Sequence, residues 1–405
     1  MLSRKVGWVK RSATQQNNAN LGLEIVSSLF KIMTIATALV DQNTIRRRGT
    51  GLRAYNPDKV FKGYTLFTPL TGNGEVYLLN LEGEVVHQWD LPYSPGLYGY
   101  LLPNGNLFYN GKTLDIPPHF PLWAAFKGGV VLEADSKGNI IWEYKHPNHH
   151  HDGRRLRNGN TILLAIEKIP QSLIPRIKGG VPGTEADGDI YADVLYEVTP
   201  GGEIVWTWHA YEHLDPDIFT ITLQDQRHEW THGNTVGELA DGNIIVSFRN
   251  ISTVVIIDRH TGEIIWTLGD DVLAQQHFPN ELANGNILIF DNGAHRRHTA
   301  LNFSRVIEVS RQTKEIVWEY TDKPPQNFFS SYISGAQRLA NGNTLITEGA
   351  YGRIFEVTVT GEIVWEYVNP HFAVRNLGEK SAVASGEQNS VFRAFRYAPE
   401  EVPWL

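Results

Sequence analysis

The phrase GEIVWEY at residues 361–367 occurs six times along the chain with small changes. The six copies are GEVVHQW (83–89), GNIIWEY (138–144), GEIVWTW (202–208), GEIIWTL (262–268), KEIVWEY (314–320) and GEIVWEY (361–367). Their tryptophans are spaced by roughly fifty to sixty residues, which is near the period of propeller blades. Self-similarity at this period predicts one supersecondary unit per copy, with neighbouring units sharing a core.

A second phrase, a leucine followed by one residue and then Asn-Gly-Asn or Asp-Gly-Asn, occurs five times. Its leucines are Leu102, Leu156, Leu239, Leu282 and Leu339. Asn-Gly and Asp-Gly between apolar alternating runs indicate tight hairpins, because a type I′ turn needs positive φ at both central residues. Each unit is therefore expected to contain four antiparallel strands, the last of which carries the tryptophan.

Six such units predict an all-β, six-bladed β-propeller over residues 59–405. Only five Asn-Gly-type turns are present, and the missing one is informative. The repeats begin at GYTLFTPL (63–70) with what reads as a second strand, and the chain ends on VFRAFRY (391–397), which alternates like a first strand. We expect the C-terminal strand to pair with the N-terminal blade and close the ring without an exposed edge.

Residues 1–58 are expected to form an N-terminal extension that is partly helical or flexible. The apolar stretch 21–40 contains Glu24 and Lys31, which favours an amphipathic helix over a membrane span or a secretory signal. A cleaved signal that ends at Ala36-Thr37-Ala38 is the alternative, and without a signal the protein would be cytoplasmic.

The composition excludes several classes of function. The chain has 36 Lys and Arg residues against 44 Asp and Glu, a net charge of −8, which argues against a nucleic-acid partner because phosphate binding needs concentrated basic residues. It contains no cysteine, so disulfides, thiolate catalysis and thiolate metal sites are excluded. We expect no cofactor.

The repeat aligns the innermost strands of successive units and reveals polar residues at equivalent positions. Five residues before each repeated leucine stand Leu97, His151, Asn234, His277 and Ser334. His232 precedes Asn234 by two residues and shares its face of the strand. Folding each hairpin about its turn is expected to place Arg249 opposite Asn234, Asn292 opposite His277 and Lys112 opposite Leu97.

The connections on the side away from the Asn-Gly turns are long: 111–129, 167–189, 211–229 and 321–329. Long loops on a compact scaffold often carry binding or catalysis. Their aromatic residues either pack within the loops or line a site, and they are Phe120, Trp123, Phe126, Phe219, Phe328 and Phe329.

The residues expected to converge at the long-loop mouth of the channel are His151, His232, Asn234, Arg249 and His277. Their chemistry suits an anion, because Arg249 offers a planar fork to a tetrahedral oxyanion and imidazoles donate to its remaining oxygens. A three-histidine metal site is the alternative, but the arginine would repel a cation. His295 and His298 lie beyond the mouth, as donors at its rim or without a role.

Four segments of the chain resemble the bacterial arylsulfate sulfotransferase family, whose members work without a nucleotide sulfate donor. They are HHDGRRLRNGN (150–160), WTHGNTV (230–236), SFRNIS (247–252) and QQHFPNELANGNILIFDNG (275–293). The resemblance runs from about residue 63 to the C-terminus, and their order, spacing and blade position all agree with the family.

The resemblance implies a ping-pong reaction in which His277 takes a sulfuryl group from an aryl sulfate, as a sulfohistidine, and passes it to a phenol. It implies that His151, His232 and Arg249 bind the sulfuryl oxygens with Asn234 beside them, and we expect Asn292 to bind substrate as well. The family has an acidic residue after the nucleophile, where this chain has Phe278-Pro279. Its secreted members imply a periplasmic location, and a homodimer is left open.

Two other functions compete with sulfuryl transfer. The first is a non-catalytic propeller that binds an anionic ligand or a protein partner at the same channel mouth. The second is a quinone-cofactor dehydrogenase, because quinoprotein propellers carry similar tryptophan repeats. Six blades rather than eight, and the absence of an adjacent cysteine pair, count against the dehydrogenase.

Overall fold

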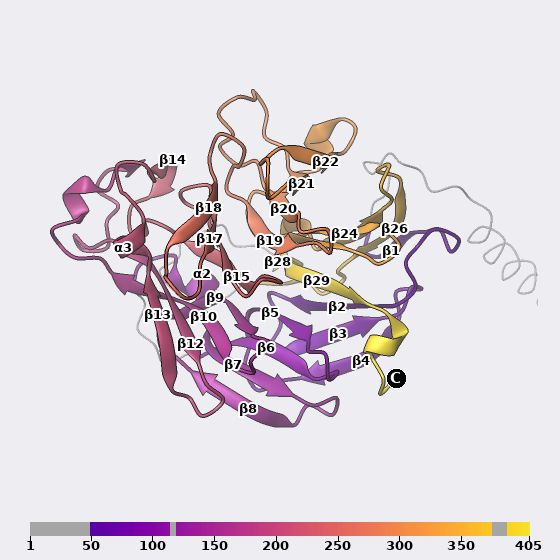
Figure 1. Ribbon diagram of the computed structural model, residues 1–405. Coiled ribbons are helices and arrows are strands. Elements are labelled where there is room, and N and C mark those ends of the chain that lie inside the picture. The colour runs from indigo at the N-terminus through magenta and orange to yellow at the C-terminus, as the bar shows by residue number, and fades with distance from the viewer. Residues whose placement is uncertain (1–48, 114–118, 375–386) are drawn as a thin grey trace, which may run out of the picture. The chain divides into compact units, whose positions relative to one another are not determined.

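A computed structural model describes residues 49–113, 119–374 and 387–405 (Figure 1). The described chain forms six antiparallel β-sheets of four or five strands, and their innermost strands contact one another in the order β29, β5, β9, β15, β19, β23 and back to β29. A closed circuit of sheets is a propeller, in which each blade shares apolar surface with the next. The predicted all-β, six-bladed fold is confirmed.

Each blade is described here from its innermost strand outward. Blade one contains β29 (Val391–Tyr397), β2 (Tyr64–Pro69), β3 (Glu75–Leu79) and β4 (Val85–Asp90). Blade two contains β5 (Pro95–Leu101), β6 (Leu107–Lys112), β7 (Gly129–Ala134) and β8 (Ile140–Lys145). Blade three contains β9 (His149–Arg155), β10 (Thr161–Lys168), β12 (Tyr191–Val198) and β13 (Ile204–His209).

The second half of the ring repeats the same plan. Blade four contains β15 (Gly233–Glu238), β16 (Ile244–Phe248), β17 (Thr253–Ile257) and β18 (Ile264–Leu268). Blade five contains β19 (His277–Glu281), β20 (Ile287–Asp291), β21 (Arg305–Val309) and β22 (Ile316–Tyr320). Blade six contains β23 (Gly335–Arg338), β24 (Thr344–Glu348), β25 (Arg353–Val357), β26 (Ile363–Val368) and β1 (Gly51–Tyr55).

Blade one joins the two ends of the repeat region, as the sequence predicted. The C-terminal strand β29, yellow in Figure 1, pairs antiparallel with β2 from Tyr64↔Tyr397 to Pro69↔Val391. Every residue of β29 is buried. The C-terminal strand therefore supplies the innermost strand that the first blade lacks, and no innermost strand is left unpaired in the described ring.

The repeated tryptophan phrase has a structural reason. In each blade one indole Nε1–H of the fourth strand donates to a backbone carbonyl in a turn of the next blade, over 2.8–2.9 Å. The six donors are Trp89, Trp142, Trp208, Trp266, Trp318 and Trp365. Each bond contributes about 0.5–1.5 kcal/mol, so the repeat fastens neighbouring blades together all the way round the ring.

Strand β1 lies within the range 1–58 that we assigned to an extension, and it pairs with β26 as a fifth strand of blade six. This fifth strand covers the outer edge of β26. Val364 of β26 is fully buried, whereas Ile265 and Val317 at the same position of blades four and five are half exposed. The rest of the expected extension, including the stretch 21–40, lies outside the described residues.

The remaining short elements lie outside the strands of the six blades. The strands are β11 (Gly179–Val181), which pairs in parallel with β14 (Ile221–Gln226), and β27 (Ala373–Val374), which pairs with β28 (Glu387–Gln388). The helical turns are α2 (Trp123–Phe126), α3 (Ala210–His213), η2 (Ile174–Arg176), η3 (Pro325–Asn327), η4 (Gly349–Tyr351) and η5 (Pro399–Glu401). Among the described residues, no helix is long and apolar enough to cross a membrane.

Candidate active site

The innermost strands are irregular where they reach the long-loop mouth. His151, His232 and Phe278 have φ of 50°, 52° and 50°, a left-handed conformation that costs of order 1–3 kcal/mol for a residue other than glycine. The strand pairing shifts at the same places, next to His151, after Gly233 and after His277. A bulge of this kind bends the strand and turns a side chain to a new direction.

These bulges change the expected cross-strand pairs. The backbone N–H of Arg249 donates to the carbonyl of His232 over 3.0 Å, so Arg249 lies opposite His232 and not opposite Asn234. His277 pairs with Phe290 and not with Asn292. The third expected pair fails as well, because the N–H of Lys112 donates to the carbonyl of Ser94 and not to that of Leu97. The ladders beside the turns run one residue out of the expected register, with Glu238 opposite Ile244 and Glu281 opposite Ile287, and the bulges shift the pairing further.

A cavity of about 210 Å³ opens at this mouth and is lined from five blades. Its polar lining residues are His151, His232, Arg249 and His277. Its remaining lining residues are Leu97, Leu122, Ala125, Phe126, Tyr332 and Ile333. The cavity therefore brings the three expected histidines and the expected arginine together beneath an apolar and aromatic wall.

His277 is 1% exposed, and its hydrogen bond sets its tautomer. Its Nδ1 lies 2.7 Å from Oδ1 of Asn292, while the amide nitrogen of Asn292 donates to the carbonyls of Ser330 and Ile333 over 2.7 and 2.9 Å. Two carbonyls can only accept, so the amide oxygen must face the histidine and Nδ1 must carry the proton. The lone pair of His277 is therefore on Nε2.

The surroundings of His277 keep its ring neutral. Burial lowers the pKa of His277 well below its usual value, and the positive charge of Arg249 lowers it further, against a smaller opposing effect of the Asn292 hydrogen bond. A neutral imidazole is the nucleophilic form. An unprotonated Nε2 beside a fixed cation suits attack on an anionic electrophile.

The other two histidines of the cavity, His151 and His232, are also positioned by neighbouring side chains. Nδ1 of His232 lies 2.7 Å from a carboxylate oxygen of the buried Glu229. The ring of His151 stacks on Phe126 at 4.7 Å between centroids, and Phe126 also meets the ring of His232 edge-on at 4.6 Å. Burial lowers the pKa of His151 well below its usual value, and the neighbouring His232 lowers it further. The imidazole rings of His151 and His232 are thus both oriented by contact with the ring of Phe126.

Arg249 is fixed on one side by a small polar network. Its Nη2 donates to Oε1 of Gln275 over 2.8 Å, and its Nη1 lies 3.3 Å from Oδ1 of Asp225. Gln275 in turn donates to the second carboxylate oxygen of Asp225. A guanidinium anchored in this way keeps its orientation without rearrangement when an anion binds.

The two asparagines expected to bind substrate stand behind the cavity wall. Asn234 is fully buried, and its amide nitrogen donates to the carbonyl of Gln276 over 2.8 Å. Asn292 is fully buried behind His277. Neither residue lines the cavity; in this structure they hold the backbone and the ring of the His277 segment.

Sequence reasoning missed the groups beneath and behind the cavity, namely Asp152, Asp193, Glu229, Gln275 and Arg393. Arg393 of β29 is fully buried; it donates to Asp152 over 3.0 Å and to the Asn234 carbonyl over 2.7 Å. The ring of Phe278 lies 4.3 Å from its guanidinium carbon. The residue that replaces the family's acidic group therefore covers a buried cation, and the arginines of VFRAFRY were the available signal.

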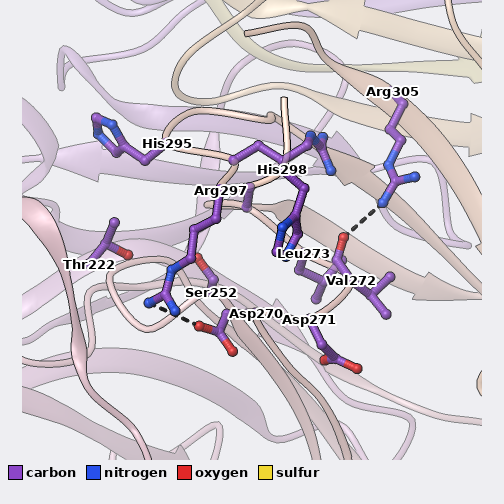
Figure 2. Close-up of a pocket in the computed structure, with 12 residues that line it drawn as sticks. Thr222, Ser252, Asp270, Asp271, Val272, Leu273, His295, Arg297, His298 and Arg305 are labelled. Carbon is purple, nitrogen blue, oxygen red and sulfur yellow. Dashed lines mark hydrogen bonds and ion pairs between the residues drawn. The ribbon is translucent and has the colours of Figure 1, made fainter. Parts of the chain in front are cut away.

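His295 and His298 line a different pocket, of about 180 Å³, together with Arg297 and Asp270 (Figure 2). Figure 2 shows Arg297 reaching Asp270, a 3.2 Å ion pair. Neither histidine lines the cavity that contains His277. Of the loop aromatic residues, Phe126 lines that cavity, whereas Phe328 packs against Phe290, Tyr320 and Phe355. Within the described ranges, no group of three or more His, Asp or Glu side chains has the arrangement of a metal site.

Solved structures with a similar fold are distant in sequence. A protein of unknown function from Bacteroides caccae is 13% identical, covers 83% of this chain and 99% of its own, and superposes with a TM-score of 0.52. A streptogramin B lyase is 12% identical over 90% of this chain and 96% of its own, with a TM-score of 0.45. At these identities the likeness concerns the fold alone. No curated protein matches the chain.

A family model decides the relationship. The model of the arylsulfotransferase (ASST) family matches residues 122–370, which is more than half of the chain and includes His151, His232, Arg249 and His277. The resemblance noted from four short segments is thereby confirmed over residues 122–370, from β7 of blade two to β26 of blade six. The chain belongs to the arylsulfotransferase family and is a sulfotransferase enzyme.

Proposed function

We propose that the protein transfers a sulfuryl group from an aryl sulfate to a phenol through a sulfohistidine at His277, without a nucleotide sulfate. The observation that carries the proposal is the state of His277: a buried, neutral imidazole whose Nδ1–H is committed to Asn292, in a cavity shared with Arg249 and two further histidines. This arrangement supports nucleophilic catalysis from Nε2.

In the first half-reaction the lone pair on Nε2 of His277 attacks sulfur, an N–S bond forms, and the S–O bond to the aryl group breaks. The phenolate leaves with the bonding electron pair. Negative charge builds on the sulfuryl oxygens and the leaving oxygen, where Arg249, His151 and His232 would donate. Preorganised donors at such positions lower the barrier, and removal of one commonly costs about 10²–10³ in rate.

In the second half-reaction an acceptor phenol loses its proton, which balances the phenolate released in the first step, and its oxygen attacks the same sulfur. The N–S bond breaks and its electron pair returns to Nε2, which regenerates neutral His277. The Asn292 carbonyl would stabilise the positive ring of the sulfohistidine between the two steps. A cavity of about 210 Å³ is smaller than the roughly 300–1,000 Å³ typical of drug-sized ligand sites. We therefore propose monocyclic aryl sulfates and phenols as the substrates, with Phe126 against the ring.

The test is nitrophenolate release from 4-nitrophenyl sulfate, with and without added phenol and with no nucleotide sulfate. The wild-type enzyme should give a burst of one nitrophenolate per site, a mass increase of one sulfuryl group on the peptide that contains His277, and turnover that depends on phenol. His277→Ala should abolish all three. Unchanged turnover in that variant would refute the nucleophile. Tight sulfate binding with no release in the wild type would instead indicate the non-catalytic, anion-binding alternative.

A further inference from the structure

A continuous chain of three side chains leads from the cavity into the protein interior. Nδ1 of His151 lies 2.7 Å from Nδ1 of His150, and Nε2 of His150 lies 3.1 Å from Oδ1 of Asp193. His150 and Asp193 are fully buried. Proton transfer to or from His151 can therefore be passed to His150, which lies beside a carboxylate that never meets solvent.

The hydrogen-bonding capacities restrict this chain to two states. The contact of His150 with Asp193 is an ion-pair contact without hydrogen-bond geometry, and a lone pair on Nε2 would face a carboxylate oxygen 3.1 Å away, so Nε2 of His150 carries the proton. If His150 is neutral, its Nδ1 accepts from Nδ1–H of His151, and Nε2 of His151 carries a lone pair. If His150 is an imidazolium, its Nδ1–H donates to His151, and Nε2 of His151 carries a proton. In the first state Nε2 of His151 can accept a proton, and in the second state it can donate one.

The charges around these three side chains determine whether a positive charge is more favourable on His150 or on His151. The fixed cation that acts on His151 is the guanidinium of Arg393, and it opposes a positive charge on the His151 ring. Beyond His150, by contrast, lies Asp193, whose Oδ2 accepts from the Thr231 hydroxyl and from the backbone N–H of Gly233, the latter over 2.7 Å. A positive charge is favoured beside this carboxylate and opposed at His151.

The packing around His150 protects such a charge pair from water. The rings of Trp123 and Phe126 lie 5.9 and 6.1 Å from the ring of His150, both edge-on. Trp123 is fully buried and Phe126 nearly so. In a dry environment of this kind the attraction between an imidazolium and a carboxylate is stronger than in water.

We infer that Asp193 and His150 form a proton relay behind His151, which acts as the acid and base of sulfuryl transfer; this inference rests on the proposed function. As the S–O bond of the donor breaks, Nε2–H of His151 protonates the leaving phenolate, and Nδ1–H of His150 replaces that proton at Nδ1 of His151. In the second half-reaction the acceptor phenol returns a proton to Nε2 of His151, and Nδ1–H of His151 moves back to His150. Protons balance over the full cycle, and Asp193 and His150 act as positioning residues.

The relay is tested by the dependence of the rate on the leaving group. His150→Gln keeps a polar side chain but cannot conduct a proton, and Asp193→Asn keeps acceptors for Gly233 and Thr231 but removes the charge. Turnover of unsubstituted phenyl sulfate, whose phenolate needs protonation, should fall about 10²-fold or more, whereas the burst with 4-nitrophenyl sulfate should fall about tenfold or less.

His149→Gln is the matched control, because His149 is the neighbouring buried residue of the same strand and its ring accepts from the N–H of Gly129 over 3.1 Å, outside the relay. A structural defect should slow both donors to the same extent. If both donors slow equally in His150→Gln and Asp193→Asn, the relay is refuted and proton transfer belongs to the His232–Glu229 pair. A wild-type enzyme without a burst would refute the proposed function itself, so the two failures are distinguishable.

Discussion

Replacement of Asn292 by alanine is the perturbation that tests the state of His277 most directly. The side chain accepts from Nδ1–H of His277 over 2.7 Å, and the ring becomes positive as the N–S bond forms. Hydrogen bonds to charged groups contribute about 1.5–3 kcal/mol, and each 1.36 kcal/mol corresponds to a factor of ten in rate. Asn292→Ala should therefore slow formation of the sulfohistidine about 10–150-fold.

The assay measures the rate of the nitrophenolate burst from 4-nitrophenyl sulfate on the millisecond-to-second scale. The amplitude of the burst shows whether every active site reacts. Asn280→Ala is the control, because Asn280 lies in the same blade and its amide nitrogen donates to the carbonyls of Phe278, Leu288 and Ala336 without touching the imidazole. A burst rate in Asn292→Ala within about twofold of wild type, or an equal loss in Asn280→Ala, would refute the reasoning.

Two further predictions concern charge. Arg249→Gln should lower the rate about 10²–10³-fold in the same assay, whereas Arg297→Gln, whose exposed side chain pairs with Asp270 outside the cavity, should not change it; an unaffected Arg249→Gln would remove the oxyanion role. Burial lowers the pKa of His149 to about 3. Below pH 6.5, therefore, His149 is protonated in the unfolded chain but stays neutral in the folded chain. The free energy of unfolding should then fall by about 1.4 kcal/mol for each unit by which the pH is lowered, from this residue alone. Urea unfolding at pH 7, 6 and 5 should show that slope, and His149→Leu should reduce it; an unchanged slope would contradict the buried neutral state.

The fold could be predicted from sequence because its determinants are local. Asn-Gly turns define the hairpins, the apolar alternation sets which face is buried, and the phase of the first and last strands implies how the ring closes. The tryptophan repeat was visible as a pattern, but its reason was not. In the structure each indole of the ring reaches a carbonyl of the next blade, as Trp365 does with Leu81 over 2.8 Å, and a contact between blades has no signature in a single repeat.

The sequence alone also identified the three histidines and the arginine that line the cavity, since His151 and His277 stand at equivalent positions of their strands, His232 lies two residues before the equivalent Asn234, and Arg249 was expected on the adjacent strand. It could not identify their chemical states. The bulges that turn these side chains inward shift the pairing by a residue, so Asn234 and Asn292 were expected at the substrate and lie behind the wall.

Only the tertiary structure decided which nitrogen of each imidazole is available and what lies behind it. The proton of His277 is set by the carbonyls of Ser330 and Ile333, which belong to the segment before the next blade. The buried cation Arg393 lies on the C-terminal strand β29, 241 positions after its partner Asp152 in the sequence. Tautomer and charge depend on atoms within a few ångströms, whatever their separation in sequence. A periodic sequence therefore predicts the scaffold and the cavity residues, while long-range packing determines their reactivity.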